Sequence, residues 1–207
     1  MKQKGIKLIS KLFCDPLACY KCVIIRVRFI INFYYRGFKY YLFNHWVAFF
    51  PCYKLRIFYL RHILGISIGK DCFIHMGCFF EGNNIVIGNN SVIGRNCYLG
   101  GSGGTLTIKN NVSITAQTYM FCSTHLVNNP KFECIHNDIT IDDYAWIGAR
   151  AMILPGVRIG KGSVLGAAST ATKDVPDYSV FAGSPAKEIG KRTTELSYLL
   201  EYFPCFQ

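Results

Sequence analysis

Two of the five histidines in this 207-residue chain, His125 and His136, lie in one stretch, YMFCSTHLVNNPKFECIHNDITI, residues 119–141. An imidazole has an unperturbed pKa of about 6.5, so it can take up and return a proton near neutral pH. This property suits a group transfer in which a base removes a hydroxyl proton and an acid then protonates the leaving group. The residues alone leave His125 equally well explained as a polar loop residue. His136, at the return of the stretch, is interpreted as structural.

A six-residue repeat flanks this stretch on both sides. Aliphatic residues recur every six positions within residues 68–74, 87–99, 108–120 and 141–171, and glycine often follows them. This period matches neither an amphipathic helix nor an ordinary alternating strand. Asn-Asn, Lys-Asp and Lys-Asn pairs supply turn chemistry between the aliphatic anchors. The repeat therefore predicts short strands joined by tight turns, wound into triangular coils around a column of aliphatic side chains.

Composition divides the chain into three segments. Residues 1–65 lack the repeat and read as a helical, basic and aromatic segment. Residues 66–190 carry the repeat, which is interrupted by a loop over residues 121–138. Residues 191–207 form a tail in which TTELSYLLEYF reads as a short helix. The expected fold class is thus an all-β core of stacked coils with an N-terminal helical segment and a short C-terminal helix.

The net charge of +11 is confined to the N-terminal third. Residues 1–65 hold 12 Lys or Arg and one acidic residue, whereas residues 66–207 hold 11 of each sign. Such asymmetry indicates attraction to an anionic partner. Basic and large apolar residues alternate in RVRFIINFYYRGFKYYLF and YKLRIFYLRHILG, as in helices that lie in a membrane interface. Packing of these helices against the coils within an oligomer explains them equally well. No recognised nucleic-acid-binding motif is present, so we expect no nucleic-acid partner.

The ten cysteines are scattered and form no paired CxxC sets. We interpret them as small apolar residues of a reducing compartment rather than as disulfides or metal ligands. No signal-peptide pattern is visible, and the longest uncharged aromatic run, Tyr40–Tyr53, is shorter than the roughly 20 residues that a membrane-spanning helix needs. We therefore expect a cytoplasmic protein whose only membrane contact is peripheral, through residues 1–65 at the inner face of the cell membrane.

The most specific pattern is IDDYAWIGARAMILPGVRIGKGSVLGAASTATKDVPDYSVFAGSPAKEIGKR, residues 141–192. Together with the repeat over residues 66–190, it resembles the left-handed parallel β-helix acyltransferases of the hexapeptide-repeat superfamily. It is similar above all to the maltose, galactoside and polysaccharide O-acetyltransferases. The resemblance implies acetyl-CoA as donor, no metal, and a homotrimer with coenzyme A between neighbouring subunits.

The same resemblance implies roles for single residues. FCSTHLVNNP resembles the extended loop that carries the family's catalytic histidine, and His125 matches that histidine. It would act as general base toward a sugar hydroxyl and then as acid toward the thiolate. The backbone N–H of Ala149 would stabilise the oxyanion. No covalent intermediate is implied, so Cys122 and Ser123 are not needed as nucleophiles. The group that orients His125 is not named by the sequence, because Leu126 cannot orient it.

The donor side also carries over from the family to matching positions. Trp146 would line the pantetheine channel, and main-chain groups of Ala149 and Ala167 would meet the pantetheine arm. The adenosine phosphates would meet a hydroxyl and two lysines, since lysine binds phosphate as a point charge: Thr172, Lys173 and Lys187.

The acceptor side departs from the maltose and galactoside enzymes. NCYLGGSGGTLTI is Gly-rich and lacks the acidic residues expected for those sugars, and it looks more like the turn in capsule and exopolysaccharide enzymes. The expected function is therefore O-acetylation of a sugar, free or lipid-linked, in capsule, exopolysaccharide or lipopolysaccharide biosynthesis. Alternatives are a nucleotide-sugar N-acetyltransferase, an amino-acid or antibiotic acetyltransferase, and a non-catalytic scaffold. The γ-type carbonic anhydrases share the β-helix but need three zinc-binding histidines with a closely spaced pair, which this sequence lacks.

Overall fold

The computed structural model describes residues 16–201, with side chains from residue 24 onward. The chain forms two compact units, Met1–Lys39 and Tyr40–Gln207. Helix α2 (Pro16–His45) occupies the described part of the first unit and continues into the second. The helical character expected of the N-terminal segment is thus confirmed, while the predicted segment boundaries stay a prediction. Expectations for residues 1–15 and 202–207 lie outside the described residues.

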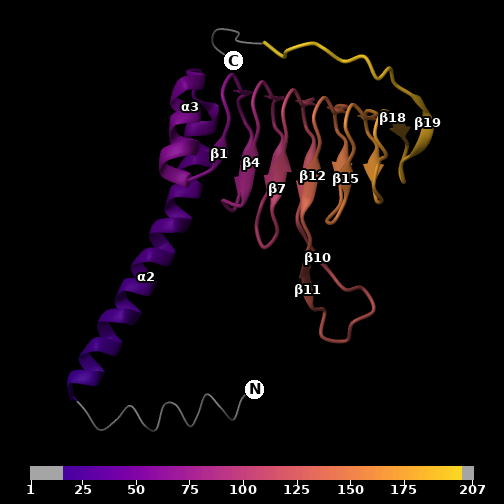
Figure 1. Ribbon diagram of the computed structural model, residues 1–207. Helices are drawn as coiled ribbons and strands as arrows, with labels where there is room; N and C mark the ends of the chain where they lie inside the picture. The colour runs from indigo at the N-terminus through magenta and orange to yellow at the C-terminus, as the bar shows by residue number, and fades with distance from the viewer. Residues whose placement is uncertain (1–15, 202–207) are drawn as a thin grey trace. The chain divides into compact units, whose positions relative to one another are not determined.

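Three sheets form the walls of a prism (Figure 1). The first wall consists of β1 (Ser67–Ile68), β4 (Ile85–Ile87), β7 (Leu106–Ile108), β12 (Ile139–Ile141) and β15 (Arg158–Ile159). The second consists of β2 (Phe73–Ile74), β5 (Val92–Ile93), β8 (Ser113–Ile114), β13 (Trp146–Ile147), β16 (Val164–Leu165), β18 (Ser179–Ala182) and the antiparallel β19 (Lys187–Lys191). The third consists of β3 (Phe79–Glu81), β6 (Tyr98–Gly100), β9 (Tyr119–Phe121), β14 (Met152–Ile153) and β17 (Thr170–Ala171).

The chain visits the first, second and third walls in turn, so three strands complete one coil. Strands in register are parallel, and the aliphatic anchors stack in columns, as where Ile141 pairs with Ile108 on one side and Ile159 on the other. All these anchors are buried except the half-buried Ile68. Phe80, fully buried, occupies the anchor position between Ile74 and Ile87 that the sequence repeat leaves blank. The β-helix expected from the repeat is therefore confirmed.

The corners use the turn chemistry that the sequence indicates. Asp71, Asn90 and Asn111 take positive φ values of 53°, 53° and 54°, a conformation that Asn and Asp tolerate better than most residues. The thiol of Cys97 donates to the carbonyl of Thr115 in the next coil, as the hydroxyl of Ser91 does to that of Lys109. Four cysteines are free thiols buried in the interior of the stack: Cys72, Cys78, Cys97 and Cys122.

A helical cap covers the first coil. It contains the end of α2, η1 (Val47–Phe49), α3 (Tyr53–Tyr59) and η2 (Leu60–Leu64). The side-chain amide of Asn44 both donates to and accepts from the backbone of Phe80, at 3.0 Å each, and the Ala48 carbonyl accepts from the Gly77 N–H. The buried Arg56 guanidinium donates to the Ile74 carbonyl at 3.0 Å. These bonds satisfy peptide groups of the first coil that no earlier coil can reach.

The expected C-terminal helix is wrong for the described residues 193–201, which form no helix. The segment after β19 instead runs back along the coils (Figure 1). Arg192 donates to the Tyr144 carbonyl at 3.0 Å, and the Leu200 N–H donates to the Asn111 side chain at 3.4 Å. Contacts with successive coils thus override the local helix propensity of this sequence, which is a weak determinant on its own.

Replacing Asn44 by Ala should destabilise the second unit. The change leaves the buried N–H and carbonyl of Phe80 without their partners, which we expect to lower the free energy of unfolding by about 2–4 kcal/mol. Denaturant unfolding followed by circular dichroism measures it. The exposed Asn128, changed to Ala, is the control and should shift stability by under about 0.5 kcal/mol. Equal effects of the two substitutions would contradict the role given to Asn44.

Candidate active site

An antiparallel hairpin leaves the prism at the corner between the third and first walls (Figure 1). Its strands, β10 (Ser123–His125) and β11 (Cys134–His136), lie in the chain between β9 and β12. Ser123 pairs with His136 and His125 with Cys134. Because alternate strand residues point to the same face, this register places both histidines on one face of the hairpin. The loop expected from the sequence is therefore an ordered hairpin for much of its length.

His125 is oriented by Phe132, at the far turn of the hairpin. Its Nδ1 lies 2.9 Å from the Phe132 carbonyl oxygen. A carbonyl only accepts, so Nδ1 carries the proton and Nε2 keeps a free lone pair. The two rings stack, with centroids 4.1 Å apart and planes 8° from parallel. Sequence reasoning missed Phe132, because a backbone carbonyl leaves no residue-type signal.

His136 lies at the root of the hairpin. The Ser123 hydroxyl donates to the Ser102 carbonyl at 2.6 Å, so it accepts from His136 Nδ1 at 2.8 Å. Gly103, with a φ of 82°, lies against the ring; a Cβ there would come within 2.0 Å of His136 Nδ1. Both imidazoles therefore hold the same tautomer. His136 is fixed against the prism, whereas His125 lies two residues farther out along the hairpin.

Cys122 is not a nucleophile in this arrangement. Its side chain is buried, and burial raises the pKa of the Cys122 thiol to about 11. The reactive form of cysteine is the thiolate, which is scarce so far below the pKa. Cys122 is therefore poorly suited to covalent catalysis.

The residues predicted for the pantetheine arm gather at the second wall and at its corner with the third. Trp146, on β13, is 48% exposed. Ala149 and Ala167 lie at that corner in successive coils, and the Ala168 N–H donates to the Ala149 carbonyl at 2.8 Å. A Cβ on Gly148 would approach the Ala167 nitrogen to 2.4 Å, so glycine permits this stacking. Within residues 16–201, no hydrogen bond occupies the N–H of Ala149 or of Ala167.

The residues predicted for the phosphates are divided between two corners. Lys187 begins β19 and pairs with Ala182 of β18, on the second wall. Thr172 and Lys173 are exposed and directly follow β17, at the corner between the third and first walls. They share that corner with the hairpin that carries His125. The contacts of a single chain therefore do not join His125 to the groups around Trp146.

Sequence reasoning also missed an aromatic ladder on the third wall. Phe79, Tyr98 and Tyr119 stack along the prism, with centroid separations of 5.2 and 6.2 Å. Phe121 lies 4.9 Å from Tyr98, and the Tyr98 hydroxyl donates to the Glu81 carboxylate. Burial and the Glu81 carboxylate raise the pKa of Tyr98. The ladder ends one residue before the hairpin. Aromatic residues at the same register of successive coils were the available signal.

A groove of about 440 Å³ lies at the corner of the second and third walls, in the first three coils. Gly94, Arg95, Thr115 and Ala116 line it, and Ala116 occupies in its coil the position that Ala149 occupies in the next. The groove thus continues the line of small residues predicted to meet the pantetheine arm. Arg95 adds a positive charge to the lining of this groove, which the sequence pattern did not indicate.

Across residues 16–201, no three His, Cys, Asp or Glu side chains are grouped so that they could hold a metal ion. None of the helices in the described region combines the length and the apolar character needed to cross a membrane.

Known proteins match both the repeat and the fold. The bacterial transferase hexapeptide family (six repeats) matches residues 138–173. A chloramphenicol acetyltransferase of Morganella morganii is 50% identical over 66 residues, 31% of each chain. A hexapeptide-repeat acetyltransferase of Vibrio cholerae, solved with acetyl coenzyme A, superposes with a TM-score of 0.68 and 26% identity, covering 76% of this chain and 85% of that one. A maltose O-acetyltransferase of Clostridium difficile 630 gives 0.67 and 26%, covering 77% and 85%. The resemblance drawn from the sequence is confirmed, although the match spans only about a third of the chloramphenicol acetyltransferase.

The hydrogen bond to Phe132 predicts the tautomer of His125. In ¹⁵N-histidine-labelled protein above the imidazole pKa, long-range ¹H–¹⁵N correlation spectra should show His125 protonated at Nδ1 and bare at Nε2. Signals are assigned with His125→Gln and His136→Gln. A His125 protonated at Nε2, or an equal mixture of tautomers, would contradict the orientation described here.

Proposed function

From the premise that this chain carries the repeat of the bacterial hexapeptide transferases, we propose that it is an acetyl-CoA-dependent O-acetyltransferase that acts on a sugar hydroxyl. The observation that carries the proposal is the hairpin, which holds His125 clear of the prism with Nε2 free to accept a proton. The acceptor that we propose is a saccharide, free or lipid-linked, of a surface polysaccharide pathway. Peripheral membrane contact through residues 1–65 belongs to the same proposal.

The reaction needs one base and one oxyanion donor. His125 Nε2 takes the hydroxyl proton as the acceptor oxygen attacks the thioester carbonyl, forming the new C–O bond. The N–H of Ala149 stabilises the oxyanion, a contribution of about 10²–10³ in kcat where it has been measured for other enzymes. When the C–S bond breaks, His125 returns the proton to the departing thiolate. The products are the acetylated acceptor and coenzyme A thiol, and no covalent enzyme intermediate forms.

The separation of the two corners supports a homotrimer. One chain places His125 at one corner, Trp146 on the second wall and Ala149 at the next corner. A neighbouring copy can present its own second wall to the hairpin, which would complete the site. The solved relative with bound acetyl coenzyme A supports this donor, and the small-residue corner supports a site for its pantetheine arm.

The aromatic ladder supports a saccharide acceptor. Sugars present flat C–H faces that pack on aromatic rings, and their hydroxyls need a few polar groups nearby. Tyr119, which is 41% exposed, offers such a ring, and Glu81 with the Tyr98 hydroxyl offers polar groups. The ladder leads to the root of the hairpin, so a bound sugar would extend toward His125.

A second candidate is acetylation of a small molecule such as an antibiotic. The 50% identity to the Morganella morganii chloramphenicol acetyltransferase favours it, over 66 residues. Release of coenzyme A thiol, measured with a sugar panel, with amino sugars and with chloramphenicol, separates the candidates. Turnover of chloramphenicol but of no sugar would overturn the sugar proposal.

The two histidines should differ in their effect on activity. We expect His125→Asn to lower kcat by about 10³-fold, within the range for loss of a general base. His136→Asn is the matched control on the same hairpin, and we expect it to retain at least about a tenth of wild-type kcat. The readout is thiol release with the best acceptor, with circular dichroism to check folding. A folded His125→Asn variant of undiminished kcat would refute the assignment.

The aromatic ladder should govern acceptor binding rather than donor binding. Tyr119→Ala removes one exposed stacking face, so we expect the KM for the saccharide to rise about 3- to 10-fold and the KM for acetyl-CoA to stay constant. Met152→Ala, next to Tyr119 on the same wall, is the control for a simple loss of surface area. A rise in the acetyl-CoA KM alone would place the ladder on the donor side instead.

A further inference from the structure

The outer face of the cap is both basic and apolar. Within α3 and η2, Ile57, Leu60 and Leu64 are buried at helical spacing against the first coil. The opposite face is exposed and forms what we call the cap stripe: Lys54, Leu55, Phe58, Arg61 and His62. Phe58 is 54% exposed although it is a large aromatic residue. A helix that covers the coils with one face thus leaves a second unpartnered face.

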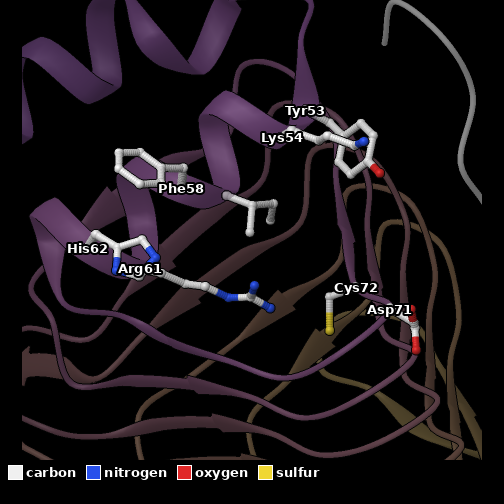
Figure 2. Close-up of a pocket in the computed structure, with 8 residues that line it drawn as sticks. Tyr53, Lys54, Phe58, Arg61, His62, Asp71 and Cys72 are labelled. Carbon is white, nitrogen blue, oxygen red and sulfur yellow. The ribbon is translucent and has the colours of Figure 1, made fainter.

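A pocket of about 310 Å³ lies between the cap stripe and the first coil. Figure 2 shows Lys54 and Arg61 reaching it from the helical side, and Asp71 and Cys72 lining it from the coil. Arg61 donates to the Gly69 carbonyl, which anchors its guanidinium. A guanidinium has five N–H donors, so this bond leaves others for an anion in the pocket. The pocket lining thus carries two cations, Lys54 and Arg61, against one carboxylate, Asp71, and its net charge is positive.

Further aromatic residues of the cap are exposed. Trp46 is 68% exposed, and Phe49 and Phe50 are also exposed in the turn before α3. No Asp or Glu occurs from Tyr40 to Leu64. Aromatic and apolar side chains beside Lys and Arg, with no acidic residue, match a bilayer interface, where rings enter the headgroup region and cations meet phosphates. An acidic protein partner would pair with the cations but leave the aromatic residues uncovered.

We propose that the cap is the docking surface for anionic phospholipid, with Lys54 and Arg61 at the headgroup phosphates and Trp46 and Phe58 in the interface. This inference deepens the membrane contact proposed above by naming its surface. The cap covers the first coil of the stack, whereas the hairpin emerges at the end of the third coil. Docking through the cap would therefore leave the hairpin unobstructed.

The test is sedimentation of the full-length protein with vesicles of phosphatidylcholine, with or without phosphatidylglycerol, in the absence of acetyl-CoA and acceptor. We expect binding only to the anionic vesicles and an about 10- to 30-fold loss of affinity in the double variant Lys54→Gln/Arg61→Gln. The control, Lys161→Gln/Lys191→Gln, removes two charges from the coils and should bind nearly as wild type. Equal losses in the two double variants would overturn the proposal.

Trp46 supplies an independent readout. In a Trp146→Phe background its fluorescence should shift to the blue with anionic vesicles and be quenched by spin-labelled lipid. Vesicle binding with unchanged Trp46 emission would overturn the proposal and assign binding to another part of the chain. A Phe58→Ser variant that changes the oligomeric state and not vesicle binding would instead assign the cap to a second copy of the chain.

Acetyl transfer to a soluble acceptor should be unaffected by Lys54→Gln/Arg61→Gln. Vesicle binding is measured without the reaction, so failure of the docking surface and failure of the transferase proposal give separate results.

Discussion

Peptide groups at the end of the coil stack are the constraint on which the rest of the structure depends. Inside the stack each coil pairs its N–H and carbonyl groups with the coils before and after it, but the first coil has no predecessor. An uncovered edge would also invite pairing with other chains. Asn44 supplies an amide to Phe80, and Arg56 and Arg61 supply guanidinium donors to carbonyls of the same coil. The stability of the β-helix therefore depends on the cap, independently of what the outer face of the cap binds.

The walls and the corners have different roles: the walls pack the core, and the corners carry the candidate site groups. The walls hold their side chains in fixed register and bury the anchors, which leaves them little capacity for reaching a substrate. The corners tolerate irregular geometry. One carries the hairpin with His125, and at another the N–H groups of Ala149 and Ala167 make no hydrogen bond within the described residues. The two sets of groups therefore lie apart on one chain, which is the ground for the homotrimer proposed above. A rigid prism suits this arrangement because it fixes the relative height of the two corners.

The sequence predicts the walls better than the site. Each six-residue unit corresponds to one strand and one turn, and residues such as Asn90 indicate where the corners lie. His125 and the donor residues came from a family resemblance, and neither period nor composition could have supplied them. The Phe132 carbonyl could not be predicted, because backbone geometry in an irregular turn is not encoded by residue type. The C-terminal helix was wrong because contacts with several coils, through Arg192 and Leu200, decide the conformation of that segment.

The register across the hairpin has a consequence for how such a protein can diverge. Ile139 and Ile141 of β12 pair with Leu106 and Ile108 of β7 as though the intervening hairpin were absent. The length of the excursion is therefore uncoupled from the alignment of the coils, and doubling a flexible loop costs only about 0.6 kcal/mol in closure entropy. Insertions and deletions can accumulate in the hairpin while the stack remains intact. The hairpin can thus change in length and sequence at little cost to the folding of the stack.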